Sequence, residues 1–266
     1  MSHKHLMLRS EVCRALALLL VPLFFATTTF GQNVGDLIVV QRQIELKLGG
    51  QTVAMLKPGY SAVVDSVRGE WLWIAEPKQG WVHRRHVRPV RVDAKFRSLK
   101  GFTINYPENW TVASNELTNE TLEATQAEFP QLKEFDLNQV AVILFDSFDS
   151  GFRENLNVVL DKGVLAATEQ NARDYAAGLK SMEDKMGVET TVTSTGVVDV
   201  GDRRACAAEF DVVSQMNDEI VHTWSVVVSG ESETFVITCT AFLEDFEWYR
   251  PLFDRMVKSL CLTAAR

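Results

Sequence analysis

Cysteine and histidine are scarce in this chain, with four and five copies among 266 residues. A metal site needs three or four ligands close together, so such a composition leaves few places for one. His83 and His86 are three residues apart, but arginines surround them and no cysteine lies near them in the sequence. A cation would be repelled there. We therefore expect no metal site and no cofactor.

No catalytic set of residues is recognisable in the rest of the sequence. His222 is the only histidine after residue 92. It alternates with Trp224 in an expected strand, which favours a hydrogen-bonded strand histidine over a catalytic one. Cys206 or Cys239 would form a dyad with His222 only if the side chains faced one another. No glycine-rich phosphate loop follows a strand. The sequence therefore predicts a protein that is not an enzyme.

Positive charge is concentrated in one part of the chain. The net charge is −8, yet residues 36–92 carry nine lysines and arginines against five acids. The excess of acids therefore lies after residue 92. Two segments of opposite sign predict two domains. Because the larger segment would repel phosphates, nucleic acid is not an expected partner.

The N-terminus has the pattern of a secretory signal peptide. Basic residues precede an apolar run over residues 15–26, and a small polar segment follows it. We predict a signal peptide over residues 1–31 with cleavage after Gly31. Export to the periplasm or the extracellular space then follows, with no membrane span left after cleavage. An uncleaved N-terminal membrane anchor is the alternative.

The segment after the predicted cleavage site keeps three cysteines, Cys206, Cys239 and Cys261. An odd number leaves at least one thiol outside any internal disulfide. Cys206 and Cys239 fall on expected strands separated by a third strand, about 10 Å apart, which is too far for a disulfide. We interpret the cysteines as small buried apolar residues.

Residues 36–92 contain five or six short expected strands separated by turns. So many short strands in one small segment favour a closed barrel, which has no free edges. The apolar positions that alternate along these strands predict its core. These are Val39, Val63, Leu72, Ile74 and Val82.

A tryptophan-rich stretch forms the centre of this predicted domain. Trp71 and Trp73 alternate with aliphatic residues in Glu70-Trp71-Leu72-Trp73-Ile74, and Gly80-Trp81-Val82-His83 follows a turn. The order of these two segments resembles bacterial SH3-like domains. The resemblance implies binding of cell-wall peptides or proteins by Tyr60, Trp71, Trp73 and Trp81, in the way that aromatic-lined grooves bind extended peptides. In the alternative interpretation, some of these indoles only cover a small core.

Residues 93–100 are expected to form a basic linker, and residues 101–263 a second domain. The expected strands include 140–145, 155–160, 190–200, 205–213, 220–228 and 234–242. Thr168 is a predicted N-cap of one helix, and a final helix begins at about Trp248. This order predicts an α+β sandwich with a mostly antiparallel sheet and flanking helices.

The second domain resembles the Mog1/PsbP-like superfamily. The resemblance lies in the opening Phe-x-Ile-x-Tyr-Pro-x-x-Trp from Phe102, the Asn155-x-Asn157-Val158-Val159 strand and the terminal Phe-x-x-Met-Val-x-Ser-Leu helix. It implies a largely non-catalytic role of unassigned type. Phe148 and Phe152, in a loop between two apolar strands, are further predicted ligand-binding residues because loops often carry function.

These features together predict an exported, non-enzymatic binding or scaffolding protein of the cell envelope. Its expected partner is an envelope protein, a peptide or a cell-wall component. A cell-wall hydrolase, or an accessory of one, is the alternative. The sequence leaves the oligomeric state open.

Overall fold

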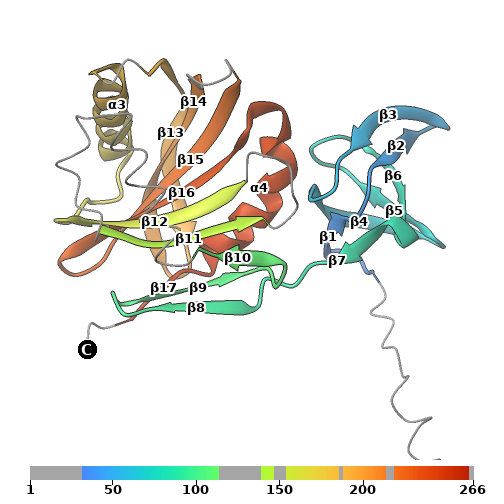
Figure 1. Ribbon diagram of the computed structural model, residues 1–266, viewed down its shortest axis with the longest axis horizontal. Coiled ribbons are helices and arrows are strands. Elements are labelled where there is room, and N and C mark those ends of the chain that lie inside the picture. The colour runs from blue at the N-terminus through green and yellow to red at the C-terminus, as the bar shows by residue number, and fades with distance from the viewer. Residues whose placement is uncertain (1–31, 114–138, 147–153, 186–187, 214–218, 264–266) are drawn as a thin grey trace, which may run out of the picture. The chain divides into compact units, whose positions relative to one another are not determined.

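Seven short strands pair into the first of three sheets in the computed structural model (Figure 1). The structure describes residues 32–113, 139–146, 154–185, 188–213 and 219–263. The strand order of this first sheet is β3-β2-β6-β5-β4-β1-β7, and all its pairs are antiparallel. The strands are β1 (Leu37–Val40), β2 (Ile44–Leu48), β3 (Gln51–Leu56), β4 (Ser61–Arg68), β5 (Trp71–Ile74), β6 (Gly80–His83) and β7 (Val87–Pro89), with a 3₁₀ turn at Arg84–His86.

The predicted closed barrel is wrong. The first sheet ends at β3, which pairs with β2, and at β7, which pairs with β1, and none of the three described sheets closes on itself. Pro89 ends β7 and has no N–H to donate to a further strand, as suits an edge position. Turn residues in a sequence indicate the number of strands, but they do not indicate whether the two edge strands of a sheet pair with each other.

The predicted core of this segment is buried at every position except Val63. Leu72, Ile74, Val82 and Val39 are at most 3% exposed, whereas Val63 is 40% exposed. Neighbouring side chains of a strand point to opposite faces of the sheet. Since Ala62 and Val64 point inward in β4, Val63 points outward.

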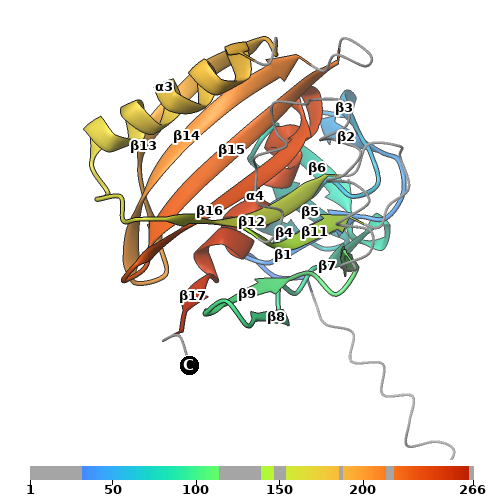
Figure 2. The same ribbon diagram turned by 60° about the vertical axis from the view of Figure 1, so that its left-hand side comes forward.

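The second sheet is larger and is also antiparallel, with the order β10-β11-β12-β16-β15-β14-β13 (Figure 2). The four strands predicted between residues 190 and 242 are present with boundaries within two residues. The strands are β10 (Trp110–Val112), β11 (Val140–Asp146), β12 (Asn155–Lys162), β13 (Thr190–Val200), β14 (Arg203–Val213), β15 (Ile220–Ser229) and β16 (Glu233–Phe242). Because β15 lies between β14 and β16, Cys206 and Cys239 are separated as expected, and both thiols are free.

A third sheet has the order β17-β9-β8, with β8 (Ala94–Ser98), β9 (Phe102–Tyr106) and β17 (Cys261–Leu262). Most of the expected linker over residues 93–100 is therefore strand β8, paired along β9. Phe102 and Ile104 of β9 are fully buried.

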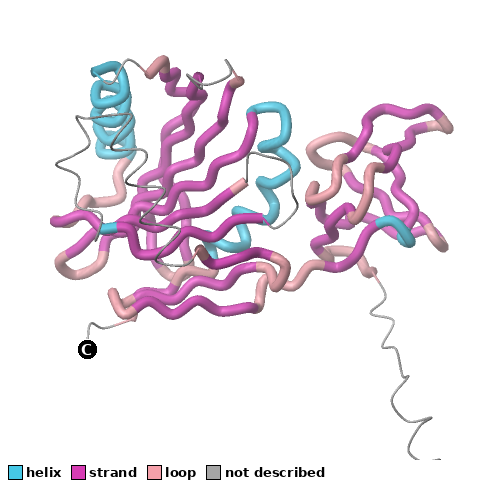
Figure 3. The backbone as a smooth tube through the Cα atoms, viewed as in Figure 1, coloured by secondary structure: helices cyan, strands magenta, loops and turns pink. Residues whose placement is uncertain are grey.

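Two α-helices, α3 (Glu169–Lys185) and α4 (Leu243–Lys258), contact opposite faces of the second sheet (Figures 2 and 3). Ala172 of α3 clusters with Cys206 of β14. The neighbouring Ala205 and Ala207 point the other way and belong to the core that α4 shares. The same helix also contacts β4, so this core is continuous with that of the first sheet.

The predicted α+β sandwich with flanking helices is wrong as well. In the described ranges the chain is mostly antiparallel strand, in three sheets with two α-helices. The weak helical pattern at residues 121–135 lies outside the described residues, as does the predicted signal peptide. No helix in the described part is both long and apolar enough to cross a membrane.

Candidate functional site

The three predicted tryptophans lie together on β5 and β6. The strand register places Trp73 opposite Trp81 and Trp71 opposite His83. The rings of Trp73 and Trp81 meet edge to face with their centroids 5.2 Å apart. Trp71 is 41% exposed, while Trp73 and Trp81 are partly exposed. Their face of the sheet is opposite that of Leu72 and Ile74, which are buried.

Cationic side chains accompany these indoles. They line a cavity of about 320 Å³, which we call the tryptophan cleft. Its lining residues are Lys47, Gly49, Gly50, Arg68, Trp71 and Trp81. The Arg68 guanidinium lies 5.6 Å from the centre of the Trp81 ring, within the range of a cation–π contact. Gly49 and Gly50 both have positive φ in the β2–β3 turn, as a two-residue hairpin turn requires.

His83 and His86 lie beside this cleft but are engaged by other groups. His86 Nδ1 is 2.6 Å from Arg42 Nη2. Burial and the neighbouring arginines Arg42 and Arg85 lower the pKa of His86. Across the described ranges, no group of three or more His, Cys, Asp or Glu side chains is placed to hold a metal ion.

Tyr60, the fourth predicted residue of the first domain, lies elsewhere. Its ring is buried and stacks on Trp248 of α4, with centroids 5.2 Å apart and planes within 8° of parallel. Its hydroxyl donates a short hydrogen bond to Asp245 Oδ1. The structure thus brings Trp71, Trp73 and Trp81 together and places Tyr60 against α4. Phe148 and Phe152 lie outside the described residues.

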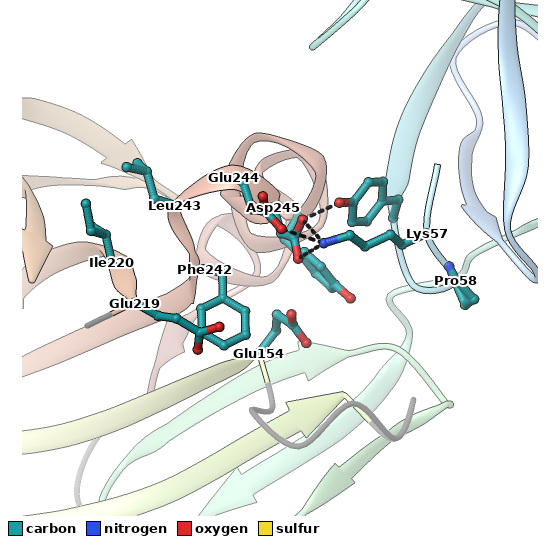
Figure 4. A pocket seen from close by; sticks show the side chains of 11 residues that line it. Lys57, Pro58, Glu154, Glu219, Ile220, Phe242, Leu243, Glu244 and Asp245 are labelled. Atoms are coloured by element: carbon teal, nitrogen blue, oxygen red, sulfur yellow. Dashed lines mark hydrogen bonds and ion pairs between the residues drawn. The ribbon is translucent and has the colours of Figure 1, made fainter. Parts of the chain in front are cut away.

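A second and larger cavity lies where the turn before β4 meets the start of α4 (Figure 4). Its volume is about 820 Å³, and we call it the α4 cavity. Lys57 reaches into it and donates to Glu244 Oε1 at 2.7 Å and to Asp245 Oδ1 at 2.9 Å. Burial alone would lower the pKa of Lys57, but these two acids outweigh it and raise the pKa.

Tyr249 and two further acids, Asp146 and Glu154, lie in the same region. The Tyr249 hydroxyl donates to Asp146 Oδ2 at 3.2 Å, and both side chains are buried. Glu154 is only 5% exposed and lines the cavity. Burial raises the pKa of Glu154 from 4.5 to about 7, with a further contribution from Asp146.

Sequence reasoning did not find the α4 cavity, because its residues are remote from one another along the chain. Lys57 and Asp245 are 188 positions apart. The only local signal was the turn at Lys57-Pro58-Gly59. Acids are common in the first turn of a helix because they interact favourably with the helix dipole. The sequence pattern of Glu244 and Asp245 therefore did not indicate that they pair with a lysine.

His222 has the hydrogen-bonded surroundings expected from the sequence. Its Nδ1 is 2.6 Å from Asp211 Oδ1, and its Nε2 is 3.2 Å from Glu209 Oε2. Arg250 of α4 donates to the other oxygen of Glu209 at 2.6 Å. Since both ring nitrogens contact carboxylates, neither is directed at a serine or cysteine.

No protein-family model and no curated protein matches the sequence. Solved structures that are similar include cyanobacterial PsbP (CyanoP) from Synechocystis, with 15% identity, a TM-score of 0.45, and coverage of 63% of this chain and 91% of that one. LpqN, involved in cell envelope biogenesis of Mycobacterium tuberculosis, has 10% identity, a TM-score of 0.38, and coverage of 61% and 83%. A Pseudomonas aeruginosa protein of unknown function has 11% identity, a TM-score of 0.34, and coverage of 63% of this chain and 94% of that one.

A PsbP protein is thus among the structures that are similar. The SH3-like part of the predicted resemblance is not shown by any of the three. Identities of 10–15% with TM-scores below 0.5 do not assign the chain to a family.

Proposed function

We propose that this chain is an exported, non-enzymatic binding protein of the cell envelope and that its ligand enters the tryptophan cleft. The observation that carries the proposal is the 41% exposure of Trp71 at the edge of a cavity that Trp81 also lines. Large aromatic side chains exposed around a hollow are typical of binding sites, because a ligand that covers them removes much apolar surface from water.

The cleft also favours one class of ligand. Lys47 and Arg68 supply positive charge next to flat aromatic faces, and no acid is among the described residues that line the cleft. Gly49 and Gly50 carry no side chains, so a ligand can approach the backbone of the β2–β3 turn closely. These features suit an extended peptide or a cell-wall component that carries carboxylates. Guanidinium and ammonium groups would pair with the carboxylates while the indoles cover apolar parts.

Two observations support a non-enzymatic role. Both nitrogens of the His222 ring contact carboxylates, and the described residues that line the tryptophan cleft include no carboxylate, cysteine or serine. Export rests on the basic and apolar pattern of residues 1–31.

The test is co-sedimentation of the purified protein with insoluble cell-wall material. Trp71→Ala is expected to weaken binding about tenfold or more, as truncation of a central aromatic contact typically does. Leu99→Ala is the matched control, because Leu99 is fully exposed in the β8–β9 turn, away from the cleft. Binding that is absent, or equal for the wild type and Trp71→Ala, would count against the proposal. Clearing of the same material in a zymogram would favour the hydrolase alternative.

A further inference from the structure

Two arginines converge on one histidine beside the tryptophan cleft. Arg42 lies in the bend before β2, and its guanidinium nitrogens Nη2 and Nε are 2.6 and 3.1 Å from His86 Nδ1. Arg85 approaches the other nitrogen of the same ring, with its Nε 3.1 Å from His86 Nε2. Both arginines are exposed, so two positive charges are held close together on the surface.

The histidine does not satisfy both arginines. A neutral imidazole has one acceptor nitrogen, and a protonated imidazole has none. At least one guanidinium group therefore points at a nitrogen that does not accept its hydrogen bond. In the part of the chain that the structure describes, neither Arg42 nor Arg85 pairs with a carboxylate. Water can solvate the spare donors, but a carboxylate would accept from them and also offset the repulsion between the two like charges.

A row of aromatic rings connects this arginine pair to the tryptophan cleft. The ring of Trp71 meets that of His83 with centroids 5.1 Å apart, and the ring of His86 follows at 5.8 Å from His83. His83 also holds the 3₁₀ turn, because its Nδ1 accepts from the Arg85 N–H. Since β5 lies between β4 and β6, Arg68 of β4 is on the opposite side of Trp71 from His83. Positive charge therefore flanks the row at both ends.

Two acids that lie close to the row in sequence already have cations as partners. Glu70 is 3.8 Å from Arg84 Nη1, and Glu45 is 3.0 Å from Lys47 Nζ. The arginines at the two ends of the row pair with no carboxylate within the described ranges. The surface around the row thus has an excess of positive charge, which attracts anions.

We propose that the ligand of the tryptophan cleft is an extended acidic peptide. One carboxylate binds between Arg42 and Arg85, a second binds at Arg68, and an apolar side chain covers the rings between them. This inference rests on the function proposed for the cleft and names the chemistry of its ligand. Guanidinium groups suit carboxylates because they form paired, charge-assisted hydrogen bonds with them.

The spacing of the row matches an extended chain. Such a chain advances about 3.3 Å per residue, so it crosses the two ring-to-ring steps in about three or four residues. Alternate side chains point the same way. Two acids about four positions apart, with an apolar residue midway, therefore face the surface together.

The experiment is an NMR titration of the full chain, in which the indole N–H and arginine Nε–H signals report binding. The probe is the peptide Glu-Ala-Leu-Ala-Glu with blocked ends, and Gln-Ala-Leu-Ala-Gln is the uncharged comparison. The acidic peptide should bind about tenfold more tightly than the uncharged one. Arg42→Gln and Arg85→Gln should each raise the Kd of the acidic peptide about fivefold. Arg173→Gln, an equal change of charge at an exposed position of α3, should leave the Kd unchanged.

Equal binding of the two peptides, no binding of the acidic peptide, or equal binding by the arginine variants and the wild type would overturn the inference. Trp71→Ala separates it from the function proposed for the cleft. If Trp71→Ala weakens binding and the arginine variants do not, the cleft holds the ligand and the carboxylate site fails. If only the arginine variants weaken binding, the carboxylate site stands and the cleft fails. Binding to vesicles of anionic phospholipid, without binding of the acidic peptide, would overturn the peptide assignment.

Discussion

At the residue scale, His222 shows how one side chain links stability to pH. Burial alone would lower its pKa, but the hydrogen bonds to Glu209 and Asp211 outweigh burial and raise the pKa above 6.5. Two residues of α4 complete these surroundings: Arg250 donates to Glu209, and the ring of Phe246 packs against the His222 ring. The protonated ring donates to both acids, so the folded state holds this proton more tightly than the unfolded chain does.

This arrangement predicts a pH-dependent stability. A raised folded-state pKa contributes stability that is fully present below about pH 6.5 and is lost as the pH rises through the folded value. His222→Gln should therefore lower the free energy of unfolding, measured in urea, by more at pH 5.5 than at pH 8.5. His83→Gln, which changes a histidine outside this acid pair, is the control. An equal cost of His222→Gln at both pH values would contradict the prediction.

At the element scale, α3 depends on a cap that the sequence already indicated. The Asn171 N–H donates to Thr168 Oγ1 at 3.1 Å, which satisfies one of the free N–H groups in the first turn. Thr168→Ala should lower the free energy of unfolding by about 1 kcal/mol. Thr168→Ser keeps the hydroxyl and should restore most of the loss. If both variants lose the same amount, the cap does not stabilise the helix.

The elements of the second sheet were predictable because their signals are local. The strands between residues 190 and 242 show alternating or continuous apolar patterns bounded by turn residues such as Gly201, which has a positive φ. The final helix, expected from about Trp248, begins at Leu243. The missed first turn contains Glu244 and Asp245, two acids that carry no apolar periodicity. They were therefore not recognised as helix.

At the scale of the whole molecule, the sequence could not indicate which distant residues meet. The closure of the first sheet into a barrel was expected from strand number alone, but closure depends on the pairing of β3 and β7, which no local pattern specifies. Tyr60 was predicted as a ligand contact because it is aromatic and lies near the tryptophans in sequence. Its burial against Trp248 depends on a helix 188 residues further along the chain.

The contact between the turn before β4 and α4 can be tested with two glycines. Gly59 and Gly69 both have positive φ, so alanine is strained by about 1 kcal/mol at either position. Only at Gly59 would the new methyl group meet other atoms, the Tyr249 hydroxyl and Asp146 Oδ2, both held in a buried hydrogen bond. Overpacking of this kind typically costs a further 1–3 kcal/mol or so.

Gly59→Ala should therefore lower the free energy of unfolding by about 2–4 kcal/mol, against about 1 kcal/mol for Gly69→Ala, measured in urea. The core runs from the first sheet through Trp248 into the second sheet, so the loss should appear in the unfolding of both sheets. Hydrogen exchange of the backbone amides, followed by mass spectrometry of peptides, reports on the two sheets separately. Equal losses for the two variants would show that the turn does not press against α4. A loss confined to the amides of the first sheet would show that the two sheets unfold independently.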